Sequence, residues 1–183
     1  MDKQKELIEL FGQDYNNVNN LVEYLNKKYP DKNIIIAGVS MGASSLLMSL
    51  KNIKEHMKVK CVISDCAYTN PYEEILYCIN HYFHINGKLF ITMINFWCSL
   101  IAKFNLLEKN TISCIKKSNI PILFIHGLDD DFVLPENSIK NYESYNGPKE
   151  LLLFENANHG ISYLIDSKKY MNKVKSFIKK YNN

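Results

Sequence analysis

The sequence contains no arginine: all 22 basic residues are lysine, and the formal net charge is only +3. Reading DNA bases and clamping phosphates depend largely on the planar, bidentate guanidinium group of arginine. No stripe of basic residues interleaved with aromatics is visible either. We therefore expect no nucleic-acid partner for this chain.

Paired cysteines are also missing. The chain has five cysteines, an odd number, and no two of them form a C-x-x-C pair. This pattern fits neither a disulfide framework nor a zinc site. Because free thiols are typical of a reducing compartment, we expect a cytoplasmic protein.

Long apolar runs are scarce as well. The most apolar stretch, residues 89–102, contains Asn95 and Ser99 and stops at Lys103, which makes it too short and too interrupted to span a bilayer. Residues 1–10 are charged and helix-like, unlike a secretion signal. We expect no membrane segment in this chain. A length of 183 residues predicts one domain with a substantial core.

Short apolar runs alternate with segments of helical periodicity. Strands are expected at residues 33–37, 59–64, 121–125 and 150–154. Helices are expected at residues 14–29, 41–50, 135–145 and 166–181, together with a long, mostly helical region at 72–117. This alternation predicts an α/β fold, with a mostly parallel sheet flanked by helices.

Glycine is scarce, yet four of the seven glycines adjoin three motifs that each follow an expected strand. The motifs are G-V-S-M-G around Ser40, H-G-L-D-D-D at residues 126–131 and A-N-H-G around His159. Serine, acid and histidine in this order are typical of an α/β-hydrolase triad. We expect Ser40 to sit at a strained strand-to-helix turn, flanked by small residues because the backbones crowd there.

Each motif has a chemical interpretation. A serine hydroxyl needs a base to remove its proton, and His159 is the expected base. The amide of Met41, at the start of a helix, is the expected oxyanion donor. His126 is expected to pack behind the site, and His56, His81 and His84 carry no motif. The residues alone leave the acid open among Asp129, Asp130, Asp131 and Asp65, the last of which could instead hold the turn at residues 67–70.

With these residues in place, the chain resembles the α/β-hydrolase superfamily, in particular bacterial serine hydrolases related to prolyl-oligopeptidase-like and Bem46-like proteins. The resemblance rests on G-V-S-M-G-A at 38–43, D-C-A-Y-T at 65–69, P-I-L-F-I-H-G-L-D-D-D-F-V at 121–133 and A-N-H-G at 157–160. It implies a triad of Ser40, Asp130 and His159, and it implies neither a metal nor an organic cofactor. It also makes residues 72–117 a helical cap inserted in the domain.

The front of the chain departs from that family, which has several strands and a His-Gly loop, supplying a second oxyanion donor, before this region. Here residues 1–10 stand in their place. We therefore expect an N-terminally truncated α/β-hydrolase fold in which residues 33–37 form an exposed apolar edge. Such an edge favours self-association.

The expected activity is hydrolysis of carboxylic esters or related small acyl compounds through an acyl-enzyme. A prolyl-oligopeptidase-like peptidase is the nearest alternative, and a non-catalytic fragment acting through its open edge is the alternative from another class. Residues 89–104 are apolar nearly all round a helix. We expect this helix to be packed in the cap, although part of it could instead line an acyl or aromatic pocket.

Overall fold

A computed structural model describes residues 14–101, 105–108 and 110–182 of the chain. Residues 1–10 and Phe104, which enter the predictions from the sequence, lie outside these ranges. Four strands form one parallel sheet in the order β1-β2-β3-β4. Their bounds are Ile34–Val39 for β1, Val59–Asp65 for β2, Ile122–Gly127 for β3 and Lys149–Phe154 for β4. The predicted α/β class is confirmed, and each strand begins and ends within two residues of its predicted bounds.

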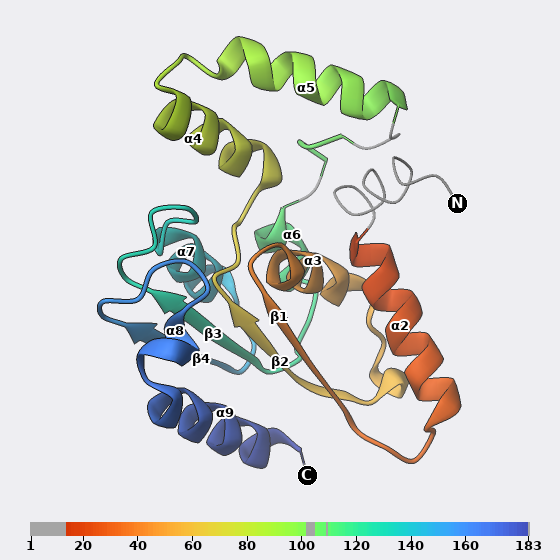
Figure 1. Cartoon of the computed structure of the whole chain (residues 1–183). Coiled ribbons are helices and arrows are strands. Elements are labelled where there is room, and N and C mark those ends of the chain that lie inside the picture. The colour runs from red at the N-terminus through yellow and green to blue at the C-terminus, as the bar shows by residue number, and fades with distance from the viewer. Residues whose placement is uncertain (1–13, 102–104, 109, 183) are drawn as a thin grey trace.

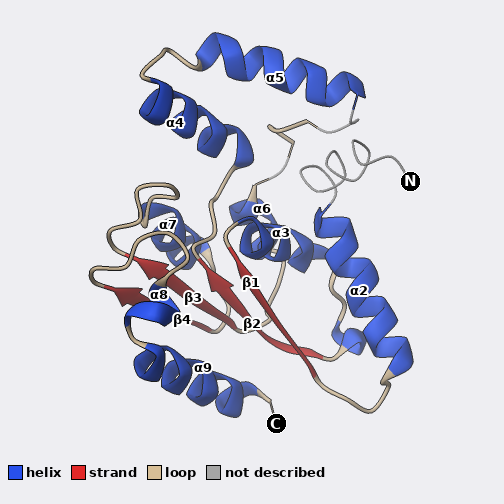
Figure 2. Ribbon diagram, viewed as in Figure 1, coloured by secondary structure: helices blue, strands red, loops and turns tan. Residues whose placement is uncertain are grey.

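Helices lie on both faces of the sheet, as Figures 1 and 2 show. One face carries α2, α3, α6 and α7, and the other carries α9, which follows the single turn α8. The helices are α2 (Asp14–Lys28), α3 (Met41–Ser49), α4 (Pro71–Phe83), α5 (Lys88–Ile101), α6 (Thr111–Ile115), α7 (Glu136–Ser144), α8 (Ser162–Ile165) and α9 (Ser167–Tyr181), with short 3-10 turns at Leu50–Asn52 and Glu55–Met57. None of the described helices is long and apolar enough to cross a bilayer.

The core has two layers because alternate residues of a strand face opposite sides of the sheet. On the α3 side, Val62 of β2 and Phe124 of β3 pack against Leu46 and Leu47. On the α9 side, Ile63 and Ile125 pack against Phe177. Every residue of β3 is buried, which accounts for the unbroken apolar run at its start.

The outer side of β1 is an edge of the sheet. Its alternate residues Ile34 and Ile36 pack toward α2 and α3, whereas Ile35 is 37% and Val39 is 52% exposed. The cluster under α9 contains residues of the other three strands and no described residue of β1. The Ile34 amide donates to the carbonyl of Lys58, just before β2, and the Ser40 amide donates to the carbonyl of Asp65, at the end of β2. Strand alternation therefore turns the backbone of Ile35, Ala37 and Val39 outward.

We expect Ile35→Lys to reduce self-association of the chain, because a charge on an edge strand opposes pairing with another edge. Sedimentation velocity at several concentrations measures the effect as a shift toward monomer. Leu21→Lys is the matched control, since Leu21 is also exposed but lies on α2. A wild-type chain that is monomeric at every concentration contradicts the expectation.

Candidate active site

The turn between β1 and α3 holds Ser40 in a strained conformation. Its φ of 54° and ψ of −121° lie in a region that side-chain-bearing residues rarely adopt. Two backbone hydrogen bonds hold the turn: the Ser40 amide donates to the Asp65 carbonyl at 2.8 Å, and the Ser44 amide donates to the Ser40 carbonyl at 3.0 Å. This strained conformation directs Oγ away from the strand end, toward the loops that follow β3 and β4.

The two glycines of the motif have different surroundings. A Cβ at Gly38 would lie 2.7 Å from the Gly42 carbonyl carbon and 2.8 Å from the Ala43 amide nitrogen, which are backbone atoms. A Cβ at Gly42 would meet nothing within 4 Å beyond its own helix. The predicted crowding is therefore correct for Gly38 and wrong for Gly42, which is exposed on the first turn of α3.

This difference gives a stability prediction. Gly38→Ala should destabilise the fold by at least about 1–3 kcal/mol, because backbone must move to admit the methyl group. Gly42→Ala should stabilise it by up to about 1 kcal/mol, since alanine is the better helix former. Urea denaturation of the two variants measures both values. A Gly38→Ala variant as stable as wild type would show that the crowding at Gly38 is relieved at little cost.

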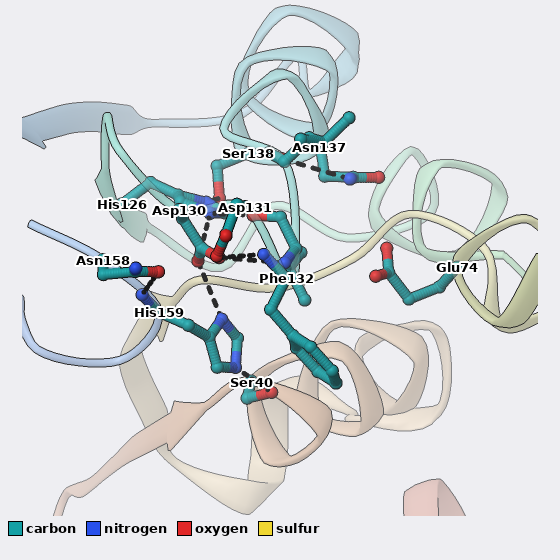
Figure 3. Close-up of polar contacts among 12 residues, drawn as sticks. Ser40, Glu74, His126, Asp130, Asp131, Phe132, Asn137, Ser138, Asn158 and His159 are labelled. Carbon is teal, nitrogen blue, oxygen red and sulfur yellow. Dashed lines mark hydrogen bonds and ion pairs between the residues drawn. The ribbon is translucent and has the colours of Figure 1, made fainter. Parts of the chain in front are cut away.

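His159 lies in the loop after β4, between two residues with left-handed backbone. Asn156 has a φ of 57° and Gly160 a φ of 68°, and the Asn158 side chain accepts a hydrogen bond from the His159 amide at 2.7 Å. The imidazole lies between two partners, as Figure 3 shows. Nε2 is 2.8 Å from Ser40 Oγ, and Nδ1 is 2.7 Å from Asp130 Oδ2. Because an ionised carboxylate can only accept, Nδ1 carries a proton and Nε2 is free to accept one from the serine.

Asp130 is almost completely buried in the loop after β3. Oδ1 accepts hydrogen bonds from the amides of Phe132 at 3.0 Å and Val133 at 2.9 Å, while Oδ2 faces His159. Burial by itself would raise the pKa of Asp130, but the hydrogen bonds from His126, His159 and the Val133 amide outweigh it and hold the pKa well below its ordinary value. The carboxylate is therefore charged at neutral pH.

His126, at the end of β3, supports that carboxylate. It is fully buried, with Nε2 at 3.1 Å from Asp130 Oδ2 and 2.8 Å from the Val133 carbonyl oxygen. Both partners only accept, so Nε2 must carry the proton. Nδ1 lies 2.6 Å from the hydroxyl of Ser138 on α7. The sequence predicts that His126 packs behind the site. It does not predict the hydrogen bond from His126 to Asp130, although the four-residue spacing between the two residues was an available signal.

The other acid candidates lie elsewhere. Asp129 and Asp131 are exposed, and neither side chain is bonded to His159. Asp65, at the end of β2, accepts a hydrogen bond from the hydroxyl of Tyr170 on α9 at 3.0 Å. The predicted alternative that Asp65 holds the turn at residues 67–70 is wrong, because its recorded side-chain bond goes to α9. Burial raises the pKa of Asp65.

Met41 is the first residue of α3, directly after Ser40. The unpaired amides of a helix's first turn carry partial positive charge and favour an anion in front of them. The position of Met41 is thus suited to an oxyanion donor, as expected from the sequence.

One cluster has metal-ligand spacing in the described part of the chain. Ligand atoms of Cys66, Asp130 and His159 lie within 4.8 Å of one another. Asp130 and His159 are already hydrogen-bonded to each other, and burial raises the pKa of the Cys66 thiol to about 12. Because a metal needs the thiolate, this donor set is poorly suited to one.

The helices α4 and α5 stand beyond the carboxyl ends of the strands (Figure 1). The Tyr77 hydroxyl of α4 donates to the Asp131 carbonyl at 2.9 Å, and the Tyr82 ring lies 6.1 Å from that of Phe132. The Phe132 ring in turn lies 5.0 Å from the His159 imidazole. One face of α4 is thereby joined to the acid loop, residues 128–133, and through Phe132 to the candidate base.

The predicted packing of α5 is wrong in the described chain. Only Ile91 of this helix is buried. The helix exposes large apolar side chains on several sides: Leu89, Phe90, Met93, Phe96, Trp97, Leu100 and Ile101. Apolar composition all round a helix predicted burial, but α4 is the one described helix against which α5 packs appreciably.

Comparison with known proteins gives a family match and a curated relative. Residues 9–183 match the model of the prolyl oligopeptidase family. An uncharacterized protein of Bacillus subtilis, YqkD, is 28% identical over 167 residues. That alignment covers 90% of this chain and 54% of YqkD, so the chain spans about half the length of this relative.

Solved structures share the fold at lower sequence identity. The esterase Pf2001 of Pyrococcus furiosus has a TM-score of 0.66 and 19% identity, and the match covers 95% of this chain and 64% of the esterase. The acylaminoacyl peptidase of Pyrococcus horikoshii has a TM-score of 0.67 and 16% identity, with 96% of this chain and 30% of the peptidase covered.

Proposed function

This chain belongs to the prolyl oligopeptidase family, and from that premise we propose that it acts as a serine hydrolase on carboxylic esters or related small acyl compounds. The observation that carries the proposal is the His159 imidazole, hydrogen-bonded to Ser40 on one side and to Asp130 on the other. Ser40 is the proposed nucleophile, His159 the general base and then acid, and Asp130 the residue that orients it.

The proposed reaction has two halves. Ser40 Oγ attacks the acyl carbon while its proton passes to Nε2 of His159, 2.8 Å away. The imidazolium formed is stabilised by Asp130, and it then gives the proton to the departing alcohol, which leaves Ser40 acylated. In the second half, water loses a proton to His159 and attacks the acyl group. His159 then returns this proton to Ser40 Oγ as the acid leaves, which restores the serine.

The oxyanion formed in each half requires hydrogen-bond donors. We assign one donor to the Met41 amide at the start of α3. In the family that the sequence resembles, a His-Gly loop ahead of this region supplies the second. Removing one such donor costs roughly 10²–10³ in rate in other enzymes.

Labelling with a fluorophosphonate probe tests the proposal without assuming a substrate. An activated serine reacts with the probe and a resting one does not, and peptide mass spectrometry identifies the residue that carries it. Nitrophenyl esters of short acids then report turnover. Absence of both labelling and turnover would favour the alternative of a non-catalytic fragment.

Peptidase activity is the second candidate, favoured by the family and by the similarity to an acylaminoacyl peptidase. Matched ester and anilide substrates with the same acyl group separate the two. We further propose a cytoplasmic location, which is supported by the five free cysteines, three of them buried.

A further inference from the structure

Glu74 lies on the face of α4 that meets the acid loop. The helix is fixed at its start by Asn70, whose side chain accepts from the Tyr72 amide at 2.8 Å. Tyr77 and Cys78 follow Glu74 by three and four residues, so all three share one face. Tyr77 bonds the Asp131 carbonyl, and Figure 3 shows the Glu74 carboxylate directed from α4 toward the loop that carries Phe132.

This carboxylate has no cationic partner among the described residues. It is partly buried, and its recorded hydrogen bond is to the Cys78 thiol at 3.8 Å, a weak donor. The charged and titratable groups that interact with it electrostatically include Cys78, Asp130, His159 and His126, and the hydroxyl groups of Tyr77 and Tyr82. Burial raises the pKa of Glu74 to about 7; the negative charge of Asp130 contributes to this value, and the hydrogen bond from Cys78 opposes it. A carboxylate desolvated beside an active site without a counter-ion is a candidate for ligand binding.

Aromatic rings lie where α4 meets the acid loop. Tyr77, Tyr82 and Phe132 border the contact between α4 and the acid loop, and Tyr82 and Phe132 are 46% and 43% exposed. The faces of such rings attract cations, and organic ammonium groups in particular. A half-buried carboxylate on the helix that also carries the exposed ring of Tyr82, opposite the exposed ring of Phe132, is therefore complementary to an ammonium group.

We propose that Glu74 is a specificity-determining residue that binds a cationic ammonium group of the substrate, with Tyr82 and Phe132 contacting its apolar surface. This inference rests on the proposed hydrolase function, because it places the cation next to the acyl group that Ser40 attacks. It restricts the substrate class to amine-bearing esters or acyl compounds.

The test compares two nitrophenyl esters whose acyl chains end in a trimethylammonium group or in an uncharged tert-butyl group of the same shape. We expect wild-type kcat/KM to favour the cationic ester by about tenfold, which is a modest value for a partly solvated ion pair. Glu74→Gln should bring the ratio close to one. Glu73→Gln is the matched control, because Glu73 is exposed on the same turn, and it should keep the wild-type ratio.

The ratio should also depend on pH. Glu74 gains a proton as the pH falls through about 7, so the preference should shrink toward pH 6 and grow toward pH 8. The trimethylammonium group does not titrate, and effects of pH on the step that both esters share cancel in the ratio. A ratio that does not change with pH would contradict the role of Glu74.

A binding measurement separates this inference from the proposed function. Saturation-transfer NMR compares choline with its uncharged carbon analogue, dimethylbutanol, and needs no turnover. Choline binding by wild type and Glu73→Gln, but not by Glu74→Gln, supports the inference even if no ester is hydrolysed. Equal binding of the two ligands by wild type, or choline binding unaffected in Glu74→Gln, overturns it even if the chain is an active hydrolase.

Discussion

Replacing Ser40 with alanine is expected to abolish fluorophosphonate labelling and to lower ester turnover by a factor on the order of 10⁶. The reason is geometric: Ser40 Oγ is the hydroxyl that lies 2.8 Å from Nε2 of the candidate base. No other serine hydroxyl in the described chain is recorded within hydrogen-bond distance of the His159 imidazole. Intact-protein mass spectrometry after probe treatment measures the labelling directly.

The neighbouring serines are natural controls. Ser44 is buried and its hydroxyl donates to the Tyr68 carbonyl at 3.1 Å, and Ser45 is also buried in α3. Ser44→Ala and Ser45→Ala should both still be labelled. Labelling that persists in Ser40→Ala would mean that another hydroxyl is activated and that the assignment of the nucleophile is wrong.

Short patterns in the sequence predicted most of the fold because each is set by local physics. The four strands are apolar runs bounded by turn residues, and β3 is buried on both faces, so its signal was unbroken. The positions of Ser40 and His159 followed from motifs tied to the ends of strands, whereas the choice of Asp130 among four aspartates came from the resemblance to the α/β-hydrolase superfamily. In a parallel sheet those ends share one edge, so residues more than a hundred positions apart meet there.

Features that depend on neighbours distant in sequence were missed. Apolar residues on every side of α5 predicted a packed helix, but burial needs a partner surface, and that cannot be inferred from the helix itself. Gly42 looked as constrained as Gly38 because a motif does not show which glycine faces another backbone. Glu74 carried no motif, and its significance comes from desolvation against the acid loop, which only the tertiary arrangement produces.

The second large effect is expected at the acid. Asp130→Asn should lower kcat by roughly 10⁴, as loss of the charged orienting residue does in other triads. An amide in this place can donate to Nδ1 of His159, which favours the tautomer with its proton on Nε2, the atom that must accept from Ser40. Asn also lacks the negative charge that stabilises the imidazolium. Steady-state kinetics with a nitrophenyl ester measure the loss.

Asp129→Asn and Asp131→Asn are the matched controls, since both side chains are exposed in the same loop. The Asp131 contact with Tyr77 uses the backbone carbonyl, which the substitution keeps. Both variants should stay within a few-fold of wild type. A large loss at either one, with Asp130→Asn active, would move the acid role to that residue.

The pH dependence of folding stability shows whether the Asp130 side chain is charged in the folded chain or only packed there. The pKa of Asp130 is depressed in the folded chain, so its contribution to stability is fully present above its unfolded value of about 3.9 and is lost as the pH falls below that value. Asp130→Asn removes this titration. The variant should therefore be less stable than wild type at neutral pH, with a difference that narrows toward pH 3. If the difference in stability between the two proteins stays constant over this range, the hydrogen bonds from His126 and His159 to Asp130 are not strengthened by a charge on the carboxylate. Asp130 could then not be the residue that stabilises the imidazolium.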